Sequence, residues 1–328
     1  MKRIESLDLF RGMAGYGVAV CHYYTYLFNS SNFEYLSFLF VDLFFVLSGF
    51  VLYPQLIKIY NDKKNVKIFY LRRWYRTIPI FIIALICFSI IFKSFNFDTL
   101  KYLFFVQKTY PDFLNSDYMV IAWSLSVEEW FYFLFPIFLI IFNKLSIEKI
   151  FIFILLIIYS LKLLFLFNFN DGDFYRTGTF LRLDAILFGA MIAHYFEVIK
   201  KFKYSLVALI ITFFIFFYFK NILTNEINFA QFIYVALIQL ISIFSIIFFI
   251  QINPIINLKY LNGLYSILAN QTYSVYLFHF IFIYFIKFYN LQNINFIFIY
   301  YILSLFIFSY LVFYLIEKSI LKLRPNYN

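Results

Sequence analysis

Residues 37–57 read SFLFVDLFFVLSGFVLYPQLI, a run of 21 residues in which Asp42 is the only charged side chain. At a rise of about 1.5 Å per residue, an α-helix of this length is about 31 Å long, which matches the hydrocarbon thickness of a bilayer. Inside lipid, a helix satisfies all its backbone polar groups within the segment. The stretch therefore predicts a transmembrane helix.

The rest of the chain repeats this pattern. Hydrophobic residues make up 64% of its 328 residues, charged residues make up 13%, and the mean hydropathy is +0.84. These values lie far outside those of soluble proteins and favour a polytopic membrane protein. We predict an all-α membrane bundle of about ten transmembrane helices. The predicted spans are residues 10–28, 37–57, 78–93, 120–142, 148–168, 181–197, 204–219, 229–250, 273–287 and 295–316.

The net charge of +10 is typical of nucleic-acid-binding proteins, but in a membrane protein basic residues first report topology. Of the 27 lysines and arginines, 19 fall on the side of the bundle that carries both chain ends, and six fall on the opposite side. The positive-inside rule therefore places both termini in the cytoplasm. We predict a multi-pass protein of the inner (plasma) membrane, with the lipid bilayer and not nucleic acid as its surroundings.

The chain shows no linker and no internal repeat, so we expect residues 1–328 to form a single integral membrane domain with no appended soluble domain. The two longest segments outside the spans are an outer loop at about 94–119 and an inner loop at about 58–77. The first span is not a signal peptide, because Arg11 interrupts its apolar run. Cys21 and Cys87 fall inside spans, so no disulfide framework and no thiol metal site is expected.

A polar stripe crosses the first span in RGMAGYGVAVCH, residues 11–22. Arg11 and His22 are three helical turns apart, so they project from one face, about 16 Å apart along the axis. Polar residues at membrane depth usually face the bundle interior and mark functional sites. Asp42 lies at a similar depth in the second span, where its carboxylate would orient His22 as a general base. A buried His–Asp pair that only ties two helices together is an equally good reading.

The inner loop carries an arginine cluster in YLRRWYRTIP, residues 70–79. Arg73 and Arg76 share one helical face, and guanidinium groups bind phosphate in bidentate fashion. The positive-inside rule explains inner arginines without any ligand, so this reading stays beside the phosphate site. Arg11, at the same membrane face, favours the phosphate site.

Further polar side chains occur near the outer ends of later spans. Glu128 and Glu129 are adjacent, so only one is expected to point inward, although either carboxylate also suits a helix N-terminus. Arg182 and Asp184 are two residues apart, so they do not face each other and each needs another partner. His279 falls about one turn into the ninth predicted span.

Six motifs give the chain a family resemblance, and they occur in the order in which the family has them. They are the Arg11 to His22 pairing, VDLFFVLSGF at 41–50, RRWYRTIP at 72–79, WSLSVEEWFYFLFP at 123–136, RLDAILFG at 182–189 and YSVYLFH at 273–279. Together they resemble the acyltransferase 3 family of membrane O-acyltransferases. The chain departs from the family at SLDLFRG, which lacks a second glycine before the arginine, and at Trp130, where glutamine is common.

The resemblance implies transfer of an acyl group, usually acetyl from acetyl-CoA, to a hydroxyl of an extracytoplasmic glycan or lipid-linked sugar. Acyl-CoA would be a substrate, with no bound cofactor and no metal. Arg11, Arg73 and Arg76 would hold the phosphates of the donor. The implied catalytic residues are His22, Asp42 and Glu128, with His22 either acting as the general base or carrying the acyl group transiently. Further pocket candidates are Ser48, Trp123, Glu129, Arg182, Asp184 and His279.

Two other functions fit a bundle with interior polar residues. A proton-coupled transporter or flippase also places Arg, His and Asp in its core, but it would usually show paired interrupted helices or an inverted repeat. A glycan polymerase or ligase would carry a larger outer loop than the one at 94–119. The third histidine, His194, lies near an inner boundary, and we expect it to be interfacial and not catalytic.

Overall fold

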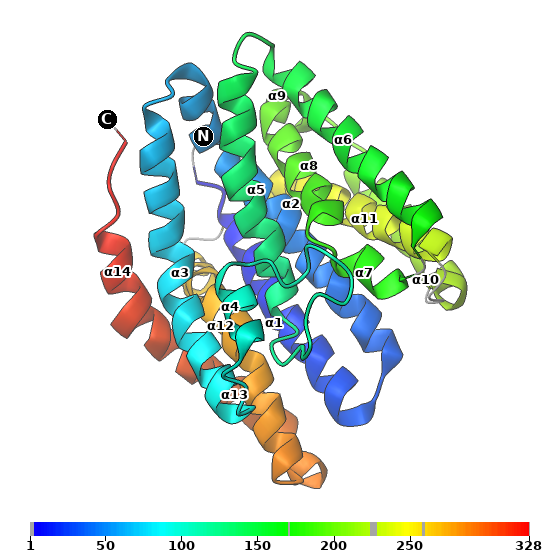
Figure 1. Ribbon diagram of the computed structural model, residues 1–328, viewed down its shortest axis with the longest axis vertical. Helices are drawn as coiled ribbons and strands as arrows, with labels where there is room; N and C mark the ends of the chain where they lie inside the picture. Colours follow the sequence, from blue (N-terminus) through cyan, green and yellow to red (C-terminus); the bar gives the residue numbers. More distant parts are fainter. Residues whose placement is uncertain (1–2, 170, 224–227, 258–259, 328) are drawn as a thin grey trace.

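The computed structural model describes residues 3–169, 171–223, 228–257 and 260–327, and these form helices with no strand among them (Figure 1). The long helices are α1 (Glu5–Phe28), α2 (Ser31–Asn61), α3 (Asn65–Ile91), α5 (Ala122–Ile141), α6 (Ile147–Asn168), α8 (Leu183–His194), α10 (Ser205–Leu223), α11 (Asn228–Ile256), α12 (Asn262–Phe288) and α13 (Ile297–Val312). The short ones are α4 (Phe97–Leu103), α7 (Gly172–Thr177), α9 (Phe196–Ile199) and α14 (Lys318–Lys322).

Every predicted span overlaps one of these helices, so the all-α class is confirmed. Within the described residues, six helical segments are long and apolar enough to cross a membrane. They are Ser31–Asn61, Asn65–Ile91, Ala122–Ile141, Ile147–Asn168, Phe229–Ile256 and Ile297–Lys322. The protein is therefore a multi-pass membrane bundle, and the total of ten crossings stays a prediction.

Two predicted boundaries are wrong. Helix α3 begins at Asn65 and not at residue 78, so the arginine cluster is helical and Pro79 lies inside the helix. Helix α12 begins at Asn262 and not at residue 273, which places His279 near its middle. Hydropathy placed the start of both spans too late, because the N-terminal part of each helix carries polar side chains; in α12, one of these, Gln271, faces another helix. The Gln271 side-chain amide donates to the Tyr16 hydroxyl at 2.9 Å.

Glycines bring α1 and α12 close together. A Cβ added to Gly12 would lie 2.7 Å from Cβ of Leu268, and one added to Gly15 would lie 2.5 Å from Cγ2 of Thr272. Small residues at such contacts let two helix backbones approach closely, as is common in membrane bundles. The face of α1 that carries Arg11 and His22 therefore packs inside the bundle.

A second glycine contact joins α2 and α8. A Cβ on Gly49 would overlap the Ile186 carbonyl oxygen, and a Cβ on Gly189 would overlap the Val46 carbonyl oxygen. The backbones of α2 and α8 are thus in direct contact, because the glycine of each helix lies against the backbone of the other. This contact fixes which side of α2 faces α8.

Both ends of the chain lie toward one end of the bundle, at the top of Figure 1, and the α1–α2 and α12–α13 connections lie at the other end. Nη1 of Arg72 on α3 donates to the Pro325 carbonyl oxygen at 2.6 Å, which holds the C-terminal segment against α3. This arrangement agrees with an even number of crossings. The cytoplasmic location of the ends stays a prediction.

The predicted outer loop, 94–119, contains α4 and is tied together by one carboxylate. Asp98 accepts hydrogen bonds from Nζ of Lys101 (2.9 Å) and from the backbone N–H groups of Asn115 (3.1 Å) and Ser116 (3.0 Å). Burial alone would raise the pKa of Asp98, but these hydrogen bonds outweigh it and hold the pKa below its usual value of 3.8. The ionised carboxylate therefore stabilises the loop.

Candidate functional site

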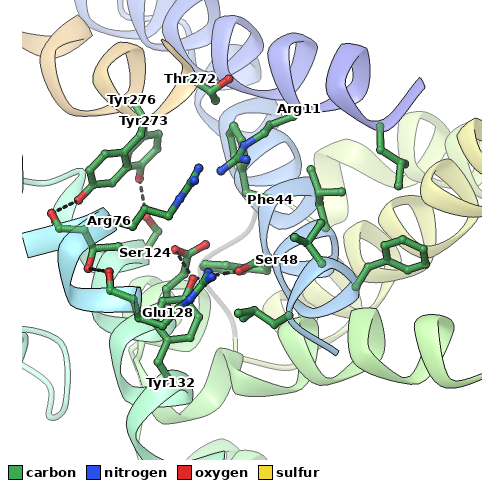
Figure 2. Close-up of a pocket in the computed structure, with 18 of the residues that line it drawn as sticks. Arg11, Phe44, Ser48, Arg76, Ser124, Glu128, Tyr132, Thr272, Tyr273 and Tyr276 are labelled. Atoms are coloured by element: carbon green, nitrogen blue, oxygen red, sulfur yellow. Dashed lines mark hydrogen bonds between the residues drawn. The ribbon is translucent and has the colours of Figure 1, made fainter. Parts of the chain in front are cut away.

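A cavity of about 470 Å³ lies between α1, α2, α3, α5 and α12, near the end of the bundle that carries both chain ends (Figure 2). Arg3 and Ile4 from the start of the chain line it, as does Arg324 from its end. The volume lies within the range typical of small-molecule sites. The cavity is thus a candidate substrate site at this end of the molecule.

Three arginines that are distant in sequence meet in this cavity. Arg11 comes from α1, and Arg73 and Arg76 come from α3. Figure 2 shows Arg11 and Arg76 pointing toward each other from two walls. Among the described residues, no carboxylate lies within ion-pair distance of any of the three. Asp8 and Glu128 also line the cavity, but together with Arg3 and Arg324 the arginines outnumber these acids, which favours an anionic ligand.

Buried donors on these arginines are unused. The Nε atoms of Arg11 and Arg73 are buried and have no hydrogen-bond partner within the described part of the chain. Nη2 of Arg73 donates to Oε1 of Gln55 at 3.1 Å, which holds that guanidinium in place. An unpaired buried donor is costly, so these groups favour an acceptor-rich ligand such as a phosphate.

The mouth of the cavity is also positively charged. Burial and the charges of neighbouring Arg76, Arg73 and Arg72 lower the pKa of Arg324 to about 10. Such a shift requires several like charges close together in a partly desolvated place. The site would therefore attract anions from the solvent at this end of the bundle.

One acid and several hydroxyl groups line the inner part of the cavity. Oε2 of Glu128 accepts a hydrogen bond from the Tyr132 hydroxyl at 2.9 Å, and that hydroxyl lies 3.0 Å from Oγ of Ser48. Deeper in the cavity, Oγ of Ser124 lies 2.6 Å from the Tyr276 hydroxyl. Figure 2 shows these groups on the walls that face the arginines. The cavity thus combines a cationic part with a row of hydrogen-bonding groups.

The expected contact between His22 and Asp42 is not formed. Asp42 forms a buried ion pair with Arg182 on the α8 side, and both side chains are 0% exposed. The reason is helical phase, because Val46 and Gly49 lie on the same face of α2 as Asp42 and contact α8. Asp42 therefore faces α8, and the prediction that its carboxylate orients His22 is wrong.

His22 contacts another histidine instead. Its Nδ1 lies 2.8 Å from Nε2 of His279 on α12, and the two rings meet edge to edge, with centroids 5.0 Å apart and planes inclined by 23°. The second buried ion pair joins Asp184 to Lys162 on α6. Arg182 and Asp184 each have a separate partner, as their spacing predicted.

The cavity does not reach His22. On α1 its deepest lining residue is Arg11, and His22 is not among the described residues that line it. Phe44 and Thr272 both line the cavity and pack against Gly15, one turn beyond Arg11. A layer of side chains therefore separates the arginines from the histidine pair.

The other candidates lie in different places. Ser48 lines the cavity, whereas Glu129 is buried and is not among the lining residues. Trp123 is buried against Phe38 and Phe45. His194 lies outside the cavity, with its Nδ1 2.5 Å from the Tyr53 hydroxyl and its Nε2 2.8 Å from Oε1 of Glu148.

Several lining residues were not predicted from the sequence. They are Arg3, Ser124, Tyr132, Thr272, Tyr273, Tyr276 and Arg324. One signal was present, because Tyr132 is four residues after Glu128 and so shares its helical face. Tyrosines were otherwise uninformative in a chain with 26% aromatic residues. Within the described residues, no three His, Cys, Asp or Glu side chains cluster as metal ligands do.

Comparison with known proteins adds to this geometry. A family model described as an acyltransferase domain (Acyl_transf_3) matches residues 4–318. The chain belongs to the acyltransferase 3 family. This match covers the helices that build the cavity and the histidine pair, so both features belong to the family domain.

The relatives are longer proteins. "Putative O-acetyltransferase SACOL0978" of Staphylococcus aureus strain COL is 29% identical over 100% of this chain and 60% of its own length. "O-acetyltransferase OatA" of Staphylococcus aureus strain NCTC 8325 is 31% identical over 58% of this chain and 34% of its own length. The chain thus spans about 60% of the first of these relatives. No solved structure matches the chain with significance.

Proposed function

We propose that the chain is a membrane O-acetyltransferase that moves an acetyl group from cytoplasmic acyl-CoA to a hydroxyl of an extracytoplasmic glycan or lipid-linked sugar. The observation that carries this proposal is the convergence of Arg11, Arg73 and Arg76 in one cavity, without acidic partners among the described residues. The family and the names of the relatives support O-acyl transfer.

The donor would lie with its phosphates among these arginines. Guanidinium groups bind phosphate oxygens through two parallel N–H donors, and the unused Nε atoms of Arg11 and Arg73 supply such donors. The thin pantetheine arm would extend past Glu128 and Ser48 toward the outer half of the bundle. Its extended length exceeds the roughly 16 Å between Arg11 and His22, so one donor molecule can span both.

His22 would act as the general base. Its Nε2 takes the proton of the acceptor hydroxyl while the new C–O ester bond forms and the thioester C–S bond breaks. The leaving CoA thiolate then receives a proton from the His22 imidazolium, which restores the neutral ring. For this step, the thioester must pass the layer formed by Phe44 and Thr272.

Turnover of acetyl-CoA by the purified protein tests the proposal. We expect acetyl transfer or slow release of CoA, and we expect His22→Ala to lower the rate per mole of folded protein by about 10²- to 10⁴-fold. His194→Ala is the matched control, because His194 contacts Tyr53 and Glu148 and not the His22–His279 pair, and it should keep the rate. Substrate flux across vesicles without any use of acetyl-CoA would instead favour the transporter or flippase.

The direction of transfer depends on topology. We propose that the chain lies in the plasma membrane with the arginine cavity open to the cytoplasm, as the basic-residue bias suggests. Reporter fusions at Lys64 and Lys201 should then report a cytoplasmic location, and fusions at Asp112 and Asp171 an extracytoplasmic one. A reversed result would place the cavity on the wrong side for cytoplasmic acyl-CoA.

A further inference from the structure

The pair formed by His22 and His279 has a defined proton arrangement. Nδ1 of His279 lies 2.7 Å from the Tyr276 carbonyl oxygen and 3.2 Å from the Val275 carbonyl oxygen. Carbonyl oxygens only accept hydrogen bonds, so Nδ1 of His279 must carry a proton. In a neutral ring the other nitrogen, Nε2, then has a free lone pair.

This lone pair determines the tautomer of His22. The 2.8 Å contact joins Nε2 of His279 to Nδ1 of His22, so His22 must be the donor and its proton must lie on Nδ1. The lone pair of His22 therefore lies on Nε2. In this form Nε2 is ready to accept a proton.

If His279 were charged, its Nε2 would donate to Nδ1 of His22, and the proton of a neutral His22 would lie on Nε2 instead. The surroundings of His279 oppose such a charge. The side chain is 0% exposed, and its ring neighbours are His22, Tyr276 and Phe280. Among the described residues, no carboxylate is hydrogen-bonded to either ring. Burying an unpaired cation is costly, so both rings are neutral at rest.

We propose that His279 is the positioning residue of this enzyme: through backbone carbonyls of α12, it holds His22 in the Nδ1–H tautomer and leaves Nε2 as the base. This inference rests on the proposed function, in which His22 takes the acceptor proton. In this arrangement a neutral histidine, His279, orients the catalytic histidine, a role that a carboxylate usually has. Asp42 is unavailable for that place, because it pairs with Arg182.

The tautomer is directly measurable, because the chain has only three histidines. Protein labelled with ¹⁵N-histidine, purified in detergent micelles, should show His22 with a protonated Nδ1 and an unprotonated Nε2. The His22→Ala and His194→Ala variants assign the signals. A proton on Nε2 of His22 would overturn the inference. This measurement needs no turnover, so it separates failure of this inference from failure of the proposed function.

Two substitutions of the same residue test the role in catalysis. His279→Gln keeps an acceptor, because the glutamine amide oxygen reaches about where Nε2 lies, whereas His279→Leu removes it. We expect His279→Leu to lower kcat by about 10- to 100-fold with an unchanged KM for acetyl-CoA, as removal of a supporting partner does in other sites. His279→Gln should recover at least about tenfold of this loss.

Equal rates for the Leu and Gln variants in folded protein would contradict the positioning role. A change in KM for acetyl-CoA, with kcat preserved, would contradict it too, because the donor arginines lie elsewhere. If His279→Leu does not fold, the tautomer measured in the unmodified protein still decides the question.

Discussion

Replacing Asp42 with asparagine removes one charge from the buried ion pair with Arg182. Both side chains are 0% exposed, so the remaining guanidinium charge would stay in a medium of low dielectric constant. Breaking a buried ion pair by removing one partner costs about 3–5 kcal/mol. Nη1 of Arg182 keeps its hydrogen bond to the Arg176 carbonyl oxygen at 3.0 Å, and an asparagine oxygen still accepts, so we expect the lower end of this range.

A loss of about 3 kcal/mol lowers the ratio of folded to unfolded protein by about 150-fold. For a chain of 328 residues, whose unfolding entropy is about 0.7 kcal/mol/K, it corresponds to a decrease in Tm of about 4–5 °C. Thermal unfolding of the purified Asp42→Asn variant in detergent measures this decrease. Acetyl transfer per mole of folded protein, measured well below Tm, should stay unchanged, because Asp42 contacts Arg182 and not His22.

The Asp42→Leu/Arg182→Met double variant is the matched control. Replacing both members of a buried ion pair with apolar residues is often neutral or stabilising, so this variant should recover most of the lost Tm. The reasoning is refuted if Asp42→Asn keeps the Tm of the unmodified protein but loses acetyl transfer. Asp42 would then act in catalysis, as its depth in the second span suggested.

Three other predictions concern the cavity, the outer loop and the helix contacts. Arg76→Ala should raise the KM for acetyl-CoA by about 10- to 150-fold with kcat preserved, since a charge-assisted hydrogen bond contributes about 1.5–3 kcal/mol. The control is Lys67→Ala, at an exposed position of the same helix, which should leave the KM unchanged. An unchanged KM for Arg76→Ala would mean that the phosphates bind elsewhere. Because the pKa of Asp98 is lowered in the folded state, its stabilisation is present above pH 3.8 and is lost as the pH falls through the lowered value. Proteolysis of loop 94–119 should therefore increase in that acid range, and persistence of the same increase in Asp98→Asn would contradict the assignment. Gly189→Ala should lower stability by about 1–3 kcal/mol or more in thermal unfolding, whereas Gly263→Ala, where a Cβ would meet nothing within 4 Å, should not; equal Tm values would disprove the backbone contact.

Much of the helical architecture could be predicted from hydropathy, because apolar side chains dominate the spans. The prediction failed where a helix buries polar residues inside the protein. The ninth span is predicted to begin at residue 273, after the polar Asn270 and Gln271, although helix α12 begins at Asn262. This shift also misplaced His279, whose depth was counted from the wrong residue.

Arg11, Arg73 and Arg76 could be predicted as site residues, because arginine in or beside an apolar span needs an aqueous or charged environment, whereas Arg3 and Arg324 could not. The partners of the acids and the histidines could not be predicted from the sequence. Asp42 and His22 lie at similar depths, and depth follows from sequence position, but contact depends on how each helix is rotated toward its neighbours. The close packing of Gly49 on Ile186 sets that rotation for α2, and only the folded structure shows it.

The layer of Phe44 and Thr272 between the cavity and His22 has a consequence for the cell as a whole. A water-filled route from the arginines to the outer face would conduct protons and small ions along a line of charged groups. Such a leak would dissipate the membrane potential that the cell uses for energy. With Phe44 and Thr272 packed against Gly15 across this route, we expect the bilayer to stay electrically insulating while the arginine cavity is filled from one side. If the proposed acetyl transfer occurs, the passage of the acetyl group would be a brief local opening, and the chain would remain a barrier between turnovers.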